Sequence, residues 1–141
     1  MNLFDEIAQV RDAGRMIAMR LEKSFSKPEE AAPRFGLLAL AEAYEEIPAE
    51  EAAAVLANVI HKDMAYGVEL VSFERAQKLA KSFLESFPLE GTRYFTNGSF
   101  GRPRGEKNTE SWWPVTDATL DTGVLVIGQS STGCLWFTDE D

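Results

Sequence analysis

Two aspartates near the C-terminus, Asp117 and Asp121, are residues whose type and spacing could do chemistry. Two carboxyl groups held at a fixed separation in a cleft act as acid and base in glycoside hydrolysis, and the nearby Trp112 and Trp113 could line a sugar site. Spacing along the chain does not itself create a cleft, however, and aspartates in turns commonly accept hydrogen bonds from backbone N–H groups. We therefore expect both aspartates to cap turns. The alternative is a small enzyme or ligand-binding domain that uses them.

Most other catalytic and metal-binding chemistries need residue types that are scarce in this chain. It has one histidine, His61, and one cysteine, Cys134. A structural zinc site draws its ligands mainly from these two types, and the Ser-His-Asp and Cys-His arrangements need a histidine beside the nucleophile. His61 falls in the last turn of a predicted helix, where the macrodipole favours a basic side chain. The sequence therefore predicts no metal site, no cofactor and no catalytic residue, as in a protein that is not an enzyme.

Residues 98–105 form a glycine-rich stretch to which Arg102, Arg104 and Lys107 give local positive charge. A phosphate-binding loop needs either a lysine and a hydroxyl residue after its glycines or the G-x-G-x-x-G pattern between a strand and a helix. This stretch has neither feature. We expect a polar loop that the protein's own acidic side chains help to hold.

The net charge of −9 is concentrated in two blocks of the sequence. Five acids and no base lie between Phe35 and His61, and six acids and no base lie after Asn108. This distribution disfavours nucleic-acid binding and favours a basic protein partner, provided that the fold brings the two blocks together. The residues that we assign to partner binding are Glu42, Glu45, Glu46, Glu50, Glu51, Asp117, Asp121, Asp139, Glu140 and Asp141, with Trp112 as an exposed aromatic anchor.

The chain has none of the patterns expected for export or membrane insertion. Its first residues, MNLFDEIAQVRD, contain acids where a signal peptide has a basic start. Its longest apolar run, residues 35–41, is far shorter than the roughly 20 residues that span a bilayer. A single cysteine cannot form a disulfide within the chain. These features favour a cytoplasmic protein that does not bind membranes.

The first two segments of the chain are predicted to be helical. Apolar residues recur at helical spacing over residues 2–25. Residues 28–47 are predicted to form a central helix that begins near Glu29 or after Pro33, because its apolar side chains leave little polar surface.

Two further helices have clear start and stop signals. Pro48 begins the third helix, which Gly67 follows, and Ser72 caps the fourth, which Pro88 ends. Residues 1–90 therefore form the helical part of a single domain that spans residues 1–141.

Residues 91–141 are predicted to form the β part. Their apolar runs have no alternation, which indicates that a hairpin joined by residues 128–133 is covered on both faces. The fold class is α+β, with about four helices packed on a C-terminal antiparallel sheet of about four strands. The predicted strands are residues 92–96, 112–116, 122–127 and 134–138.

The C-terminal 30 residues or so resemble small uncharacterised bacterial proteins, some of which are immunity proteins that neutralise secreted or contact-delivered toxins. The resemblance implies a protein-binding role and carries no catalytic motif. It rests on Trp113 to Thr116, Ala118, Thr119, Asp121, Gly123 to Ile127, Gly133 to Trp136 and Asp139 to Asp141.

The favoured hypothesis is a small acidic, cytoplasmic protein-binding module of immunity type that occludes a basic toxin such as a nuclease. The second hypothesis is the small enzyme or ligand-binding domain that uses Asp117 and Asp121. The third is a structural subunit that associates with itself through the C-terminal hairpin. The sequence leaves the oligomeric state and the partner's identity open.

Overall fold

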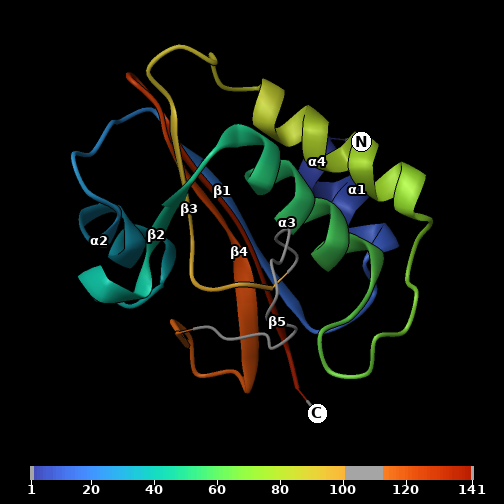
Figure 1. The fold of residues 1–141 in the computed structure, drawn as a ribbon. Helices are drawn as coiled ribbons and strands as arrows, with labels where there is room; N and C mark the ends of the chain where they lie inside the picture. Colours follow the sequence, from blue (N-terminus) through green and yellow to red (C-terminus); the bar gives the residue numbers. More distant parts are fainter. Residues whose placement is uncertain (1, 101–112, 141) are drawn as a thin grey trace.

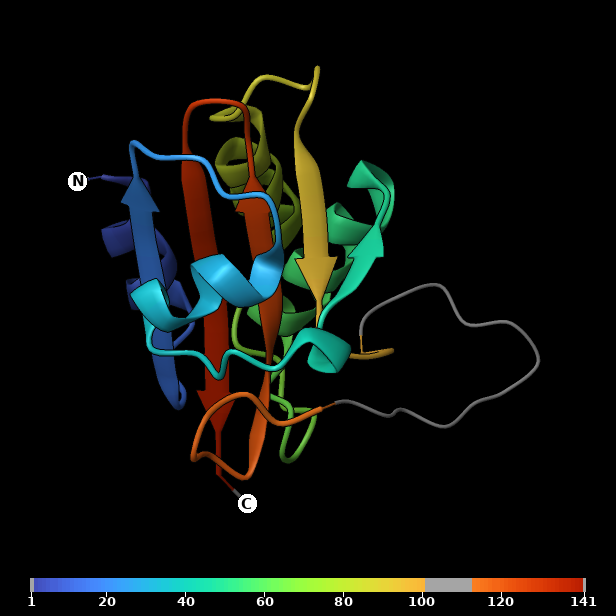
Figure 2. The same cartoon turned by 90° about the vertical axis from the view of Figure 1, so that its left-hand side faces the viewer.

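The computed structural model describes residues 2–100 and 113–140, which form an antiparallel sheet with helices on both faces (Figures 1 and 2). Its five strands are β1 (Arg15–Leu21), β2 (Glu45–Ile47), β3 (Arg93–Thr96), β4 (Leu120–Ile127) and β5 (Thr132–Asp139). Their order is β1-β5-β4-β3-β2, so the first two strands in the chain lie at the two edges of the sheet. The α+β class is confirmed, with five strands in place of the predicted four.

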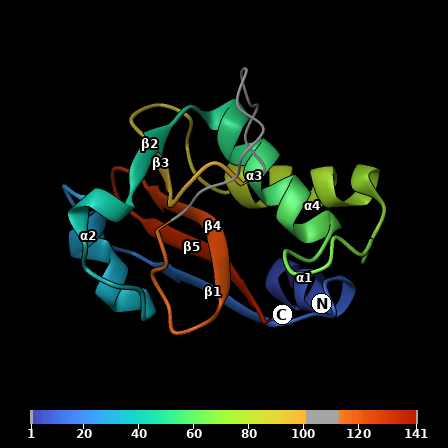
Figure 3. The same cartoon turned by 60° about the horizontal axis from the view of Figure 1, so that its bottom comes forward.

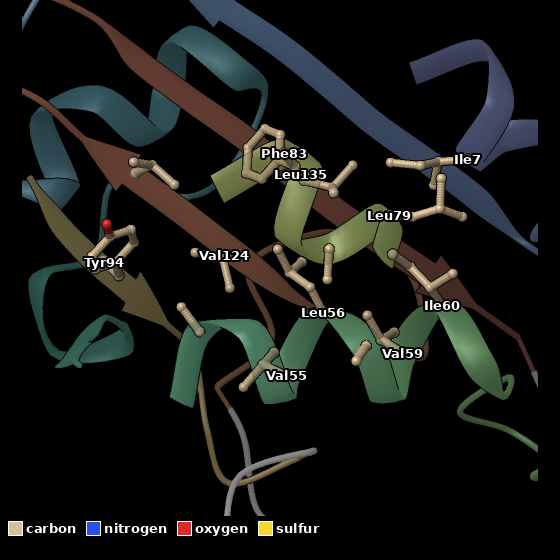
Figure 4. Close-up of a cluster of buried hydrophobic side chains, with 14 of the residues drawn as sticks. Ile7, Val55, Leu56, Val59, Ile60, Leu79, Phe83, Tyr94, Val124 and Leu135 are labelled. Atoms are coloured by element: carbon tan, nitrogen blue, oxygen red, sulfur yellow. The ribbon is translucent and has the colours of Figure 1, made fainter. Parts of the chain in front are cut away.

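The two faces of the sheet are covered by different parts of the chain (Figure 3). One face carries α1 (Leu3–Val10), α3 (Ala49–His61) and α4 (Phe73–Glu85). The opposite face carries α2 (Pro28–Ala31) and two 3-10 turns, η1 (Ala32–Phe35) and η2 (Ala41–Ala43). Each layer buries its own apolar cluster against the sheet, and Figure 4 shows the larger cluster between α3, α4 and the central strands.

The third and fourth predicted helices are confirmed as α3 and α4. Pro48 precedes the first residue of α3 as its N-cap, and the Ser72 hydroxyl accepts a hydrogen bond from the Arg75 N–H at the start of α4. These local signals define both helices because a fixed φ at proline and a capping oxygen each favour the first turn.

The prediction of one helix over residues 2–25 is wrong after Val10. Gly14 adopts a left-handed φ of +56°, and the chain then enters β1, where Arg15 pairs with Thr138 of β5. The side chains of Ile17 and Leu21 reach one apolar cluster, and those of Met16 and Ala18 reach the other. An apolar stretch that fits helical spacing thus forms a strand, because pairing with a distant strand partly buries apolar side chains on both of its faces.

The prediction of a helix over residues 28–47 is wrong after Phe35. Helical structure stops at Phe35, because Gly36 takes a left-handed φ of +80° and its N–H caps the preceding turn. The apolar side chains beyond it, such as the buried Leu37, lie across the sheet in an irregular segment before η2 and β2. Burial on the sheet accounts for Leu37 without a helix, whereas Leu38 is exposed.

The predicted C-terminal hairpin is confirmed as β4 and β5, and both of its faces are buried. Val124 and Leu135 pack under α3 and α4, whereas Leu125 and Trp136 pack under the α2 layer. In the described chain, β1 pairs with β5 from Thr132 to Thr138, and β3 pairs with β4 from Leu125 to Ile127. These stretches of the hairpin edges are therefore occupied within the chain.

The strand predicted for residues 112–116 is not formed in its described part, residues 113–116, which has an irregular path toward β4. None of the helices in the described chain has the length and apolar character needed to cross a membrane.

Candidate functional site

A groove of about 850 Å³ opens at the end of the sheet where β1 begins and β5 ends. Four parts of the chain form it: residues 14–17 at the start of β1, Gly36 with Leu38, residues 115–118, and Thr138 with Glu140 at the end of β5. These parts lie together on the α2 side of the sheet (Figure 2). The groove is the point at which the predicted acidic C-terminus meets an apolar surface.

One wall of the groove is apolar and firmly held. Leu38 is 54% exposed, and its N–H donates to the carbonyl of Val115 over 3.0 Å. The Tyr44 hydroxyl donates to the carbonyl of Leu38 over 2.6 Å. Burial, followed by the nearby Cys134 and Asp121, raises the pKa of Tyr44 above its usual value, so this hydroxyl stays protonated and able to donate.

Two carboxylates give the groove a negative rim. Asp117 and Glu140 are both exposed and line the groove, whereas Arg15 is the basic residue among those that line it. The Thr119 N–H lies 3.3 Å from the Glu140 carboxylate, and the Thr119 hydroxyl also donates to it. Glu140 is thereby oriented beside the 115–118 wall while it remains open to solvent.

Asp121 is a buried acceptor beneath that wall. Its carboxylate accepts hydrogen bonds from the N–H of Val115 over 3.1 Å and from the Trp136 indole over 3.1 Å. The N–H and hydroxyl of Thr116 and the side-chain amide of Asn97 also donate to it. Asp121 thus accepts from backbone N–H groups, as expected of a turn aspartate, but it lies within β4 and holds residues 115–116 rather than a turn before Gly123. It shapes the groove wall from inside the protein.

The acid–base alternative needed Asp117 and Asp121 to converge in one pocket. Asp117 lies on the groove rim, whereas Asp121 is buried among hydrogen-bond donors and does not line the groove. Of the two carboxylates, only that of Asp117 lines the groove, which does not favour a shared acid–base site.

Asp139 is likewise buried, in an ion pair with Arg11. Arg11 Nη2 lies 2.7 Å from Asp139 Oδ2, and the same oxygen accepts from the Met64 N–H over 2.8 Å. Arg11 also donates through Nε to the carbonyl of Val59 over 2.6 Å. The expectation that Asp139 forms part of an exposed docking rim is wrong, because this carboxylate joins α1, α3 and β5 in the interior.

The acids of the first block lie at the opposite edge of the sheet. Glu42, Glu45 and Glu46 are exposed, and Arg93 lies 3.1 Å from Glu46 in an ion pair. Glu50 and Glu51 begin α3, beyond the other end of β2. Because β3 and β4 separate β2 from β5, the two acidic blocks do not merge into the single negative face that the sequence suggested.

The aromatic anchor and the last acid named by the sequence, Trp112 and Asp141, lie outside the described residues, as do Arg102, Arg104 and Lys107. Trp113, in contrast, is described and is 51% exposed. Its backbone is fixed by Asn97, which accepts from the Trp113 N–H over 2.7 Å and donates to the Trp113 carbonyl over 2.8 Å.

Leu38 and Asn97 are site residues that the sequence reasoning missed. Leu38 falls within the helix predicted over residues 28–47, and Asn97 is assigned no role from the sequence. Gly36 lies within the apolar run that contains Leu38. This glycine was the available signal that the helix ends there.

His61 and Cys134 occupy structural positions. His61 Nδ1 lies 2.7 Å from the Val71 carbonyl, and the ring packs edge-on against Phe73. Cys134 is fully buried, and burial raises the pKa of its thiol, which disfavours the reactive thiolate. Across residues 2–100 and 113–140, no cluster of three or more His, Cys, Asp or Glu side chains is arranged to hold a metal ion.

Comparison of the chain with protein-family models, with curated proteins and with solved structures finds no match.

Proposed function

We propose that this protein is a binding module that docks a basic protein partner at the groove and acts as an inhibitor of immunity type. The observation that carries the proposal is the exposure of Asp117 and Glu140 beside the apolar Leu38 wall. An interface generally combines a desolvated apolar centre with charged groups at its rim, and this groove offers both.

The charge of the groove favours a basic partner. Carboxylates at an exposed rim attract opposite charge during diffusional encounter and so raise the association rate. The net charge of −9 also attracts a basic partner, over a longer range. Both effects weaken at high salt, because the Debye length falls from about 10 Å at 0.1 M to about 3 Å at 1 M ionic strength.

The inhibitor role is supported by the rigidity of the groove walls. Hydrogen bonds from Tyr44 and to Asp121 hold both walls, so little conformational entropy is lost when a partner docks. A small rigid acidic surface suits the occlusion of a toxin's basic substrate-binding surface. The resemblance of the C-terminal segment to immunity-type proteins points to the same role.

Affinity capture from a lysate of the native organism tests the proposal. The full chain is the bait at low and at high salt, bound proteins are identified by mass spectrometry, and the main candidate is then purified and titrated. We expect one basic protein that is retained at low salt, partly released at high salt and inhibited on binding. A partner that is acidic, or one whose binding does not depend on salt, would contradict the proposal.

A further inference from the structure

The outer edge of β1 is open in the described chain. Across residues 2–100 and 113–140, β1 pairs with β5 alone, and it is the outermost strand of the sheet (Figure 2). Its register with β5 runs without a bulge from Arg15 opposite Thr138 to Leu21 opposite Thr132. Alternate N–H and C=O groups of such a strand point away from the sheet and can pair with another chain.

The other edge of the sheet is shorter than β1 and acidic. β2 has three residues, and Glu45 and Glu46 are charged and exposed. Short length and charge are common devices that prevent a strand edge from pairing. β1 has seven residues without proline, and Arg20, one of its two charged residues, is already hydrogen-bonded to Glu22 over 2.9 Å.

The open edge is continuous with the groove. Residues from Gly14 to Ile17 belong to both, because they begin β1 and line the groove. Ile17 and Leu38 offer an apolar surface, while Asp117 and Glu140 lie at the rim. An extended chain laid along β1 would therefore place alternate side chains into the groove.

We propose that the partner supplies an extended segment, with basic and apolar side chains in alternation, that pairs with β1 as a sixth strand and fills the groove. This inference rests on the proposed function and adds how the partner binds. Main-chain hydrogen bonds to the edge would provide affinity, and the groove would select the side chains. Charge decides the occupant, because Asp117 and Glu140 need basic side chains opposite them.

A second copy of this chain fits the edge less well. It carries the same net charge of −9, which opposes its approach to the acidic rim of the groove.

Amide hydrogen exchange of the full chain, followed by NMR, tests the strand pairing. The probe is an eight-residue peptide of alternating lysine and valine, and the control peptide has glutamate in place of lysine. We expect alternate amides of β1 to exchange at least about tenfold more slowly with the lysine peptide bound, and to be unaffected by the glutamate peptide. Unchanged exchange at saturating lysine peptide would overturn the proposal, as would protection that needs only a higher concentration of the protein itself.

Two neighbouring proline substitutions provide a matched pair, Ala18→Pro and Met19→Pro. One removes an N–H that points outward, and the other removes an N–H that bonds to β5, because successive N–H groups of a strand point to opposite sides. Proline is tolerated on the open side of an edge strand. The variant that keeps the wild-type melting temperature should bind the lysine peptide at least about tenfold more weakly. Wild-type affinity in that variant would overturn the proposal.

If neither proline variant folds, binding of the lysine peptide is measured instead with the double variant Asp117→Asn, Glu140→Gln. We expect about tenfold weaker peptide binding from the loss of two rim charges, and unchanged binding would overturn the proposal. The outcomes also distinguish a failure of strand pairing from a failure of the proposed function. A basic partner that binds without protecting β1 would contradict strand pairing and leave the proposed function standing. The absence of any protein partner would contradict the proposed function itself.

Discussion

Asp139 and Glu140 are neighbours in the sequence and have opposite surroundings in the structure. Asp139 is buried against Arg11 and the Met64 N–H, whereas Glu140 is exposed at the groove rim. Asp121 and Asp117 repeat this contrast, with the first enclosed by donors and the second open to solvent. The comparison teaches that an acidic block is not one functional unit. Of its four described carboxylates, Asp121 and Asp139 are buried and Asp117 and Glu140 are exposed at the groove.

For Asp139 and Glu140 the contrast follows from where the strand ends. Every residue of β5 is buried and the strand ends at Asp139, so Glu140 lies beyond the covered sheet. A buried carboxylate then persists only where donors replace its water. Arg11 and Trp136 provide such donors from distant parts of the chain.

The largest expected effect is that of Asp139→Ala. Removing this carboxylate leaves the buried Arg11 guanidinium without its partner, which typically costs about 3–5 kcal/mol of unfolding free energy. Urea denaturation followed by circular dichroism measures the loss. Glu140→Ala is the control and should change stability by less than about 0.5 kcal/mol. Equal losses of stability in the two variants would contradict the distinction between the buried Asp139 and the exposed Glu140.

Asp121→Asn comes next. The asparagine keeps the shape of the side chain but directs an N–H₂ group at donors such as the Val115 N–H and the Trp136 indole. We expect a loss of about 2–3 kcal/mol, since hydrogen bonds to a charged group are involved. Asp117→Asn should stay within about 0.5 kcal/mol of the wild type. A stable Asp121→Asn protein would mean that the buried carboxylate does not hold the groove wall.

Tyr44→Phe should have a smaller effect. It removes the hydrogen bond to the Leu38 carbonyl, which is worth about 1 kcal/mol. Tyr66→Phe is a matched control, because Tyr66 is 71% exposed and should tolerate the change. Thermal denaturation compares the two variants. A larger loss in Tyr66→Phe would contradict the assignment of Tyr44 as the residue that holds the groove wall.

The sequence was sufficient for elements with local signals. Pro48, Ser72 and Pro88 bound α3 and α4, and the continuous apolar runs identify β4 and β5 as a covered hairpin. It was insufficient for β1 and β2, which are edge strands paired with residues far away in the chain. The apolar residues of β1 satisfy a helical pattern equally well, and its pairing with Thr132 to Asp139 leaves no local trace.

The candidate site was only partly predictable for the same reason. The sequence named Asp117 and Glu140, which line the groove, and grouped them with Asp121 and Asp139, which do not. The burial of Asp139 and Asp121 depends on Arg11 and Asn97, respectively. Each of these partners is too far from its acid in the sequence to form a local pattern with it. Leu38 was missed because its exposure depends on where the chain stops being helical.

The central claim is that the exposed rim carboxylates, and not acidity in general, bind the partner. Its most direct test is quantitative capture from the native organism's lysate with three baits: the wild type, Asp117→Lys with Glu140→Lys, and the charge-matched control Glu85→Lys with Glu90→Lys. Glu85 and Glu90 are exposed and lie outside the groove. We expect a basic protein to be held by the wild type and the control and lost from the rim variant. Equal loss from both variants would contradict the account, because net charge alone would then explain the binding.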